Sequence, residues 1–506
     1  MIECKFGRYM QIFLVITFLL TLYPIQSSSI YVHAHSPIFD YSCYIQGDYS
    51  RIGFQSTLIA GEVHTFAKLR LYKYWGYSRP DVHPPILFVG DKLIVAFKSY
   101  RGSSRCHQDI VRNPLVLQVY RISKLSGNSL YLFSTCYLSE LEGISLYYSN
   151  GYIYVSGLYM INSSWNWYVF KPVIYKCSLT GCILWKNIID YEITANATLY
   201  HNHIMCSYFA RPYFSIFTFS GAVYVIESIS PMHFPKVFIL DDENGSTIEA
   251  FNLFSSYDFP RYYSEILISI RYGKMYCKAL QFTIRGIHRT PENVIISAFS
   301  IHPFKLLWAQ EFHYCKTMSS GCWTMFCMNF VVEDFQGRLC VPTITGLTVF
   351  NEHGDLIGNY SFFTTRESIW WFSCIGYSHL FATSPRLSAV AYTDRIIVLD
   401  RSFRVLKEFS YPLGGFVFCL YSLCICWNVI FISFLGNPFS GILLMDFNGN
   451  IIWERYVSTL YYAALVGNYI VIVTEYFIEI YSIRFCEPSI HHFYTSFSSY
   501  ATYTPL

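Results

Sequence analysis

Short apolar segments separated by turn residues recur along the chain and predict repeated β-hairpins. Each hairpin has an apolar strand, a turn that often contains Gly or Asn, and a second strand that often carries Trp or Phe. Apolar or alternating runs of about four to eight residues bounded by such turns are typical of strands. Seven hairpins of this kind span residues 117–133, 173–188, 237–253, 295–312, 347–362, 396–411 and 443–457.

A second kind of hairpin lies between them. One hairpin of each kind makes four strands, and successive units begin about 45 to 65 residues apart, which is the period expected for a propeller blade with loops of varying length. The turns of the second kind are predicted at Gly90-Asp91, Asn150-Gly151, Ser220-Gly221, Tyr272-Gly273, Gln336-Gly337, Trp427-Asn428 and Gly467-Asn468.

The ends of the chain complete this pattern. The last unit, 461–485, has strands but no recognisable second turn with Gly, and the segment 55–72 at the start has no unit of its own. A ring of blades leaves only short exposed edges, so we expect segment 55–72 to supply the outer strand of the last blade. The predicted fold is all-β: a single β-propeller of four-stranded blades, eight in number. Seven blades remain an alternative because the unit at 371–395 is poorly marked.

Composition favours strands over helices. Aromatic residues make up 19% of the 506-residue chain, with 45 Tyr and 43 Phe, whereas charged residues make up only 14%. Aromatic and β-branched side chains fit a pleated, half-buried surface, and blades buried on both faces account for the low charge. The net charge is +3 and no basic run occurs, so we expect no nucleic-acid partner.

The N-terminal segment has the layout of a secretory signal peptide. Lys5 and Arg8 precede the apolar run 12–22, which is followed by Pro24 and small residues up to Ser29. We predict a signal peptide at 1–29, a propeller at 30–488 and a Ser- and Tyr-rich tail at 489–506. An uncleaved membrane anchor is the alternative, and it would be the chain's only membrane contact. The uncharged stretches 413–436 and 457–474 are interpreted as buried hairpins, because Gly and Asn interrupt them.

Cysteines and glycosylation motifs agree with export. Without Cys4 the number of Cys is even, as expected for a chain that forms disulfides in an oxidising compartment. Cys177 and Cys182 flank a turn and are the predicted disulfide, with buried free thiols as the alternative. Asn162, Asn196, Asn244 and Asn359 begin Asn-x-Ser/Thr triplets and are candidate glycosylation sites.

One hairpin resembles the quinoprotein-like propeller repeats, whose pattern is similar to A-x-D-x-x-T-G-x-x-x-W. Tyr175, Cys177, Thr180, Gly181 and Trp185 stand at its five fixed positions, so Thr-Gly and Trp match while Ala and Asp do not. Other units keep parts of the pattern. The resemblance implies that the Trp packs between neighbouring blades, which gives structural docking roles to Trp185, Trp308 and Trp453 and to the turn glycines Gly181, Gly245 and Gly449.

The sequence holds little recognisable chemistry. Quinone-binding members of the resembled family use a calcium site and a disulfide between adjacent cysteines, but this chain has no Cys-Cys dipeptide, and we expect no cofactor. His201 and His203 alternate on an expected strand and are weak metal-ligand candidates, since no third ligand is indicated. We find none of the common hydrolase, metalloprotease or nucleotide-binding motifs, and no residue is assigned a catalytic role.

Two functions are compatible with these features. The first is a non-enzymatic platform, secreted or at the cell surface, that binds protein or glycan through loops at one end of the ring. Trp165, Trp167, Trp370 and Trp371 offer aromatic faces suited to this role. The second is an exported enzyme, either a quinone-dependent oxidoreductase or a hydrolase, with its site in the central channel. The convergence of carboxylates or histidines from different blades would distinguish the two.

Overall fold

The residues described by the computed structural model are almost all β-strands and belong to the compact unit His35–Leu506. They are residues 63–70, 86–89, 91–98, 114–123, 129–139, 141–163, 167–196, 214–227, 229–230, 235–253, 264–271, 274–285, 288–313, 332–342, 346–362, 380–384, 386–392, 394–411, 416–425, 429–437, 439–458, 460–466, 469–474 and 477–483. Among these residues no helix has the length and apolar character needed to cross a membrane.

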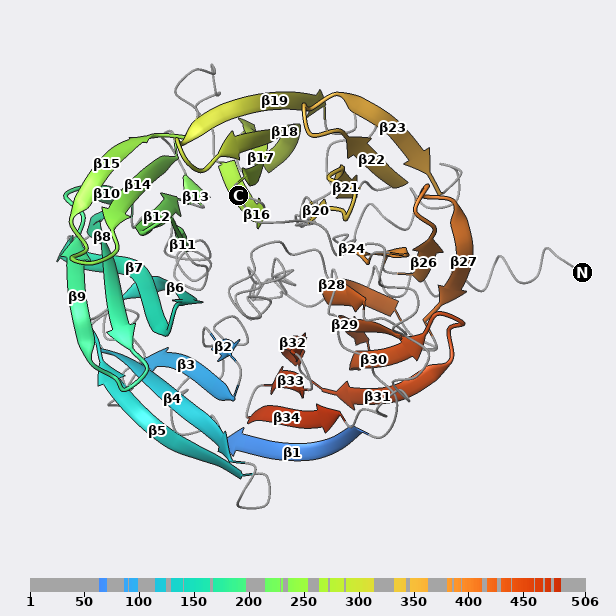
Figure 1. Ribbon diagram of the computed structural model, residues 1–506, viewed down its shortest axis with the longest axis horizontal. Helices are drawn as coiled ribbons and strands as arrows, with labels where there is room; N and C mark the ends of the chain where they lie inside the picture. The colour runs from blue at the N-terminus through green and yellow to red at the C-terminus, as the bar shows by residue number, and fades with distance from the viewer. Residues whose placement is uncertain are drawn as a thin grey trace, which may run out of the picture. The chain divides into compact units, whose positions relative to one another are not determined.

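The strands form eight sheets arranged around a ring, and we call them blades 1 to 8 (Figure 1). Blade 1 contains β2 (Ile86–Val89), β3 (Lys92–Lys98), β4 (Leu115–Ser123) and β5 (Ser129–Tyr137). Blade 2 contains β6 (Glu142–Ser149), β7 (Tyr152–Ser163), β8 (Trp167–Ser178) and β9 (Ile183–Ile188), and β10 (Ile193–Asn196) also pairs with β8. Blade 3 contains β11 (Phe214–Phe219), β12 (Ala222–Glu227), β14 (Lys236–Asp241) and β15 (Thr247–Asn252).

The remaining blades follow the same order from the innermost strand to the outermost. Blade 4 contains β16 (Ser264–Arg271), β17 (Lys274–Arg285), β18 (His288–Ser300) and β19 (Lys305–His313), with the short β13 (Ile229–Ser230) beside β16. Blade 5 contains β20 (Val332–Glu333), β21 (Leu339–Pro342), β22 (Gly346–Phe350) and β23 (Leu356–Ser361); blade 6 contains β24 (Leu380–Thr383), β25 (Ser388–Ala391), β26 (Arg395–Leu399) and β27 (Val405–Ser410). Blade 7 contains β28 (Phe416–Ile425), β29 (Val429–Asn437), β30 (Ser440–Asp446) and β31 (Ile451–Val457).

Blade 8 joins the two ends of the propeller sequence. Its inner strands are β32 (Leu460–Val466), β33 (Tyr469–Thr474) and β34 (Phe477–Ile483), and its outer strand is β1 (Val63–Arg70). β1 pairs antiparallel with β34, from Val63 opposite Ile483 to Arg70 opposite Phe477. The prediction that segment 55–72 closes the ring is therefore confirmed for the strand 63–70.

Contacts between consecutive blades follow the ring without a break. Strands of neighbouring blades touch between blades 1 and 2, 2 and 3, 5 and 6, 6 and 7, 7 and 8, and 8 and 1. Blade 3 contacts blade 4 through a hydrogen bond from the Tyr224 hydroxyl to the Ile301 carbonyl, 3.1 Å long. Blade 4 contacts blade 5 through the Trp308 indole, as described below. The predicted eight-bladed propeller is confirmed.

The hairpins also agree with the sequence-based expectation. All seven hairpins of the first kind are outer strand pairs of blades 1 to 7. Asn150-Gly151 and Ser220-Gly221 have positive φ at both residues, the geometry that two-residue hairpin turns favour. The uncharged stretches 413–436 and 457–474 contain the strand pairs β28–β29 and β32–β33. The poorly marked unit at 371–395 supplies β24 and β25 of blade 6, which excludes the seven-bladed alternative.

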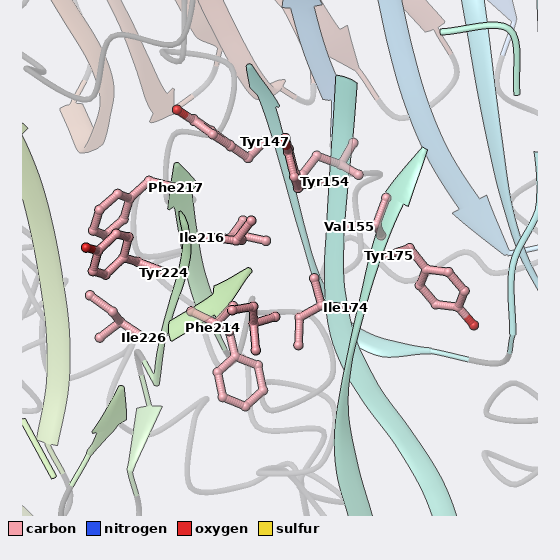
Figure 2. Close-up of a cluster of buried hydrophobic side chains, with 14 of the residues drawn as sticks. Tyr147, Tyr154, Val155, Ile174, Tyr175, Phe214, Ile216, Phe217, Tyr224 and Ile226 are labelled. Atoms are coloured by element: carbon pink, nitrogen blue, oxygen red, sulfur yellow. The ribbon is translucent and has the colours of Figure 1, made fainter. Parts of the chain in front are cut away.

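Burial falls from the inner strands to the outer ones. Strands such as β25 and β30 are buried along most or all of their length, whereas most side chains of the outer strands β27 and β31 are exposed. Between blades 2 and 3, apolar side chains from both sheets meet in one cluster, which includes Tyr154, Phe214 and Ile216 (Figure 2). Phe217 and Tyr224 stack there with ring centroids 4.8 Å apart. This packing accounts for the high aromatic content.

Candidate interaction surface

Exposed aliphatic side chains recur on the outer strands of the propeller. In blades 2, 5, 6 and 7, two consecutive aliphatic residues stand near the start of the outer strand, and each is between 39% and 56% exposed. In the corresponding part of blade 1, Leu132 is 49% exposed and stands between the exposed Tyr131 and Phe133, and in blades 3 and 4 Ile248 and Leu307 are 61% and 46% exposed. We call this set the apolar rim: Leu132, Ile183, Leu184, Ile248, Leu307, Leu356, Ile357, Val405, Leu406, Ile451 and Ile452.

The members of the rim have equivalent places in their blades. Each follows the turn that joins the third strand of a blade to its outer strand. Because blades repeat around the ring axis, equivalent positions lie at the same end of the propeller. Each aliphatic pair stands at a β-bulge, where the register between the outer strand and the third strand shifts by one residue.

Such a rim is unusual for outer strands. An edge strand offers unpaired backbone groups, and proteins commonly protect such edges with charged side chains or Pro. Exposed apolar residues that gather in one region mark interaction surfaces more often than single scattered ones do. The rim was not predicted from the sequence, although a signal was present: an aliphatic pair stands two and three residues after Gly181, Gly354 and Gly449.

The first predicted docking residue, Trp185, lies between blades 2 and 3. Its indole Nε1 donates a 2.9 Å hydrogen bond to the carbonyl of Asp242, in the β14–β15 turn of the next blade. Gly245 of the same turn lies under the ring, and an added Cβ there would stand 2.5 Å from Cε3 of Trp185. Gly245 also has a φ of 73°, which favours glycine. The turn therefore needs glycine for both backbone conformation and contact.

The same arrangement recurs between blades 4 and 5. Trp308 Nε1 donates to the Glu352 carbonyl at 2.9 Å, and an added Cβ at Gly354 would lie 2.6 Å from the Trp308 ring. Trp453, of blade 7, packs its ring 5.2 Å from that of Tyr481 in blade 8. Each predicted Trp thus contacts the blade that follows it.

The other two predicted glycines lie against different partners. An added Cβ at Gly449 would be 3.3 Å from the Phe409 ring of blade 6, and one at Gly181 would be 3.0 Å from the Thr135 carbonyl of blade 1. In blade 6 the corresponding turn position is Phe403, with a φ of 61°. Its ring packs against Tyr360 of blade 5, with centroids 5.0 Å apart.

A buried charge cluster supports the contact between blades 2 and 3. Lys176 Nζ lies 2.8 Å from Asp242 Oδ1, and the Tyr154 hydroxyl donates to the same oxygen at 2.6 Å. Burial and the hydrogen bond to Asp242 raise the pKa of Tyr154 well above its ordinary value. Tyr154 therefore stays neutral and donates its proton to the carboxylate. The cluster orients the turn that carries Gly245.

A second charge cluster lies at the ring closure. Glu479 forms ion pairs with Lys68 of β1 at 2.7 Å and with Arg455 of β31 at 3.4 Å. It also accepts a hydrogen bond from the Tyr481 hydroxyl at 2.8 Å. Burial alone would raise the pKa of Glu479, but the hydrogen bonds from Lys68 and Tyr481 and the charges of Lys68 and Arg455 outweigh it, and the pKa is lowered. The carboxylate joins blade 7, β34 and the closing strand.

The two cysteines of the predicted disulfide do not stand opposite each other in the hairpin. Cys177 and Cys182 are both free thiols; Cys177 is buried and Cys182 is exposed. The residue that faces Cys177 across the hairpin is Ile183, because the turn shifts the register by one residue relative to the expectation. The Cys177 side chain points instead toward blade 1, where its sulfur interacts with that of Cys136.

The other candidate residues are placed as follows. Asn162, Asn244 and Asn359 are exposed, as glycosylation requires, and Asn196 lies in β10, where its side chain is not described. His201, His203, Trp165, Trp370 and Trp371, the signal segment and the tail lie outside the described residues, as does the Trp167 side chain. Within the described part of the chain, no three His, Cys, Asp or Glu side chains are close enough to hold a metal ion.

Comparison with known proteins shows a likeness of fold alone. No protein-family model matches the sequence, and no curated protein sequence does. The chain is similar to the WD40 domain of Pan2 from Neurospora crassa, with 7% identity over 85% of this chain and 98% of that one, and a TM-score of 0.37. It is also similar to apo AztD from Citrobacter koseri, with 11% identity over 71% and 86% of the two chains and a TM-score of 0.35.

A third similar structure is an α-L-arabinofuranosidase from Fusarium graminearum, with 12% identity over 66% of this chain and 93% of that one, and a TM-score of 0.35. At such identities the functions of these proteins do not transfer to this chain. The quinoprotein-like resemblance stays a prediction, since no family model supports it.

Proposed function

We propose that this protein is a secreted or cell-surface β-propeller that acts as a non-enzymatic interaction platform and binds a protein partner. The observation that carries the proposal is the apolar rim, which repeats from Leu132 of blade 1 to Ile452 of blade 7. Burying an exposed aliphatic side chain against a partner is favourable, by roughly 25 cal/mol for each Å² of apolar area. A partner that covers several blades would gain from many such contacts.

The chemistry of the rim favours protein over glycan. Sugars stack on flat aromatic faces with polar edges, whereas the rim consists of Leu, Ile and Val. Blade 1 differs, because Tyr131 and Phe133 flank Leu132 and are 43% and 40% exposed. The rest of the rim is aliphatic and matches an apolar protein surface better than a sugar. The N-terminal signal-like segment and the exposed Asn162, Asn244 and Asn359 support export.

The test compares the full mature chain with a rim variant on intact cells of the source organism. The variant carries Leu184→Glu, Leu356→Glu and Leu406→Glu, one change in each of three blades. We expect labelled wild-type protein to bind the cells, at least a tenfold loss of binding by the variant, and loss of wild-type binding when the cells are first treated with protease. The matched control is Glu311→Lys, which changes an exposed residue of the outer strand β19.

Several outcomes would contradict the proposal. Equal binding by the rim variant would show that the rim is not the binding surface. Binding that survives protease but is lost after glycosidase treatment would assign the partner to the glycans. If wild-type protein instead self-associates in sedimentation experiments while the rim variant is a monomer, the rim would be an interface between copies of this chain.

The exported enzyme remains the second prediction from sequence. It depends on carboxylates or histidines that converge in the central channel, and residues 71–85, 197–213, 254–263, 314–331 and 363–379 lie outside the described part of the chain. Among the described residues, the buried carboxylates belong to three different blades: Glu227 to blade 3, Glu333 and Asp334 to blade 5, and Glu479 to blade 8.

A further inference from the structure

Two buried cysteines, Cys136 of blade 1 and Cys177 of blade 2, belong to one hydrophobic cluster. The outer strand of blade 1, β5, continues past β8 of blade 2 in the opposite direction. Near one end of this contact, Ser134 Oγ donates to the Leu179 carbonyl at 2.7 Å. Near the other end, the Ser139 backbone N–H donates to the Tyr175 hydroxyl at 3.3 Å.

Cys136 and Cys177 occupy the middle of this contact. Residues 134 and 136 share one face of β5, and residues 175 and 177 share one face of β8, since side chains alternate along a strand. The two hydrogen bonds therefore direct Cys136 and Cys177 toward each other. Their side chains belong to the same hydrophobic cluster, and the residues are 4% and 0% exposed.

The turn of blade 2 lies closer to the backbone of blade 1 than the turns of blades 3 and 5 lie to the backbones of blades 2 and 4. Ser134 donates a hydrogen bond to the Leu179 carbonyl, in the outer turn of the next blade. Trp185 and Trp308 donate to the corresponding turns of the blades that follow them. A serine is much smaller than a tryptophan, so the backbones approach: an added Cβ at Gly181 would meet the Thr135 carbonyl oxygen at 3.0 Å instead of an indole ring. This close approach brings the two thiols together.

The interaction between the two thiols also shifts their pKa values in opposite directions. A hydrogen bond from Cys177 lowers the pKa of Cys136, whereas the same hydrogen bond and burial raise the pKa of Cys177 well above its ordinary value. Cys136 is thus the sulfur that ionises first. Since the thiolate is the reactive form, Cys136 is the expected attacking group.

We propose that Cys136 and Cys177 form a disulfide that links blade 1 to blade 2. The oxidant is a disulfide, either oxidised glutathione or a disulfide-exchange protein, and it acts while the chain folds, before the blade contact buries the two sulfurs. The Cys136 thiolate attacks one sulfur of the oxidant and forms a mixed disulfide, releasing one thiol of the oxidant. Cys177 then loses its proton, attacks the Cys136 sulfur and releases the second thiol. The two cysteines together lose two electrons and two protons, and the oxidant gains them.

This disulfide would hold the propeller together beside its ring closure. It encloses residues 136–177, which contain the whole of β6 and β7. A cross-link that closes a long loop removes conformational freedom from the unfolded chain. Between blades 1 and 2 the disulfide would take the place of the tryptophan contact that Trp185 and Trp308 make between other blades.

Peptide mapping of the full mature chain tests the proposal. The purified protein is reduced and unfolded, refolded in the presence of oxidised glutathione, blocked with an alkylating reagent in denaturant and digested without reductant. We expect a peptide linked between Cys136 and Cys177 in the wild-type protein and in Cys182→Ser, and a lower melting temperature for both after reduction. In Cys136→Ser, reduction is expected to cause at least a twofold smaller shift.

The mapping on wild-type protein needs no variant to fold, so the proposal can be rejected directly. Alkylated Cys136 and Cys177 after oxidation would overturn it. A peptide that links Cys177 to Cys182, which Cys182→Ser would abolish, or a link from either cysteine to another part of the chain would overturn it as well.

Discussion

The turn at Gly245 shows how one residue serves two physical requirements. Its φ of 73° lies in the left-handed region, where a side chain costs about 1–2 kcal/mol. Its Cα also lies under the Trp185 ring, so an added methyl group would stand 2.5 Å from a ring carbon. Gly151 has a φ of 87° but has open space around the Cβ position. A substitution at Gly151 therefore measures backbone strain alone, whereas one at Gly245 adds the loss of the contact between blades.

Gly245→Ala should destabilise the protein more than Gly151→Ala does. We expect a loss in the free energy of unfolding of about 1–2 kcal/mol for Gly151→Ala, from backbone strain alone. Gly245→Ala should lose a further 1–3 kcal/mol or so, because Trp185 must move away from the Asp242 carbonyl. Urea unfolding of both variants followed by Trp fluorescence measures the difference. Equal losses would mean that Trp185 adjusts without cost.

At the residue scale, the sequence predicted the docking positions better than it predicted their partners. The repeat pattern selected Trp185 and Gly245, yet the Lys176–Asp242–Tyr154 cluster was not foreseen. Its members are separated by 66 and 88 residues in sequence, and only the docking of two blades brings them together. The proposed pairing of Cys177 with Cys136 was missed for the same reason, since the local turn suggested Cys182 and Cys136 lies in the neighbouring blade.

Among the elements, the closing strand β1 is held in part by an ion pair. Lys68 of β1 stands opposite Glu479 of β34 in the register and forms an ion pair with it. Arg455 brings the outer strand β31 of blade 7 to the same carboxylate. One buried Glu thus connects the closing strand to its own blade and to the neighbouring one.

This arrangement makes the ring closure sensitive to acid. The pKa of Glu479 in the folded protein lies below its ordinary value of 4.5. The ionised carboxylate therefore stabilises the fold; its contribution is complete above pH 4.5 and is lost as the pH falls through the folded-state pKa. Asp91 and Asp446 also have lowered pKa values, so Glu479 supplies one part of the total acid sensitivity.

Glu479→Gln should reduce both stability and its pH dependence. At pH 7 we expect a loss of about 2 kcal/mol in the free energy of unfolding, since charge-assisted hydrogen bonds are replaced by neutral ones. Between about pH 5 and pH 3 the melting temperature of this variant should fall less steeply than that of the wild-type protein. Calorimetry across this range provides the measurement, with the exposed Glu311→Gln as the control. Parallel pH profiles for wild type and Glu479→Gln would refute the role of this carboxylate.

At the element scale, most strands were predictable because their turns are local signals. A Gly or Asn between two apolar runs marks a turn in the sequence without knowledge of the fold. Asn150-Gly151 is an example, and both residues have positive φ in the structure. The strands β10 and β13 were not predicted, because each depends on a longer strand that offers it a free edge: β10 pairs with Trp167–Phe170, beyond the part of β8 that pairs with β9. The short β24 and β25 lacked a Gly turn and were weakly marked.

On the scale of the whole molecule, the propeller is closed by a strand from the opposite end of the sequence. Val63, the first residue of β1, pairs with Ile483, the last residue of β34. Without β1 the backbone of β34 would present an unpaired edge, which is a template for association with other chains. Because the end of β34 lies beside the start of β1, a copy of β1 placed directly after β34 in the sequence could form the same strand pair as a hairpin.

Moving β1 to the C-terminal side of β34 should therefore preserve the closed ring. We compare the mature chain with a chain that begins at residue 73 and with a permutant that begins at residue 73 and carries residues 55–72 after residue 488. The shortened chain should aggregate or melt at a lower temperature, whereas the permutant should be monodisperse and melt near the mature chain. Leu69→Pro in the permutant is the matched control, because proline within β1 removes a backbone donor and disturbs the ladder with β34. A shortened chain as stable and monodisperse as the mature one would mean that seven complete blades and β32–β34 hold the ring without the closing strand.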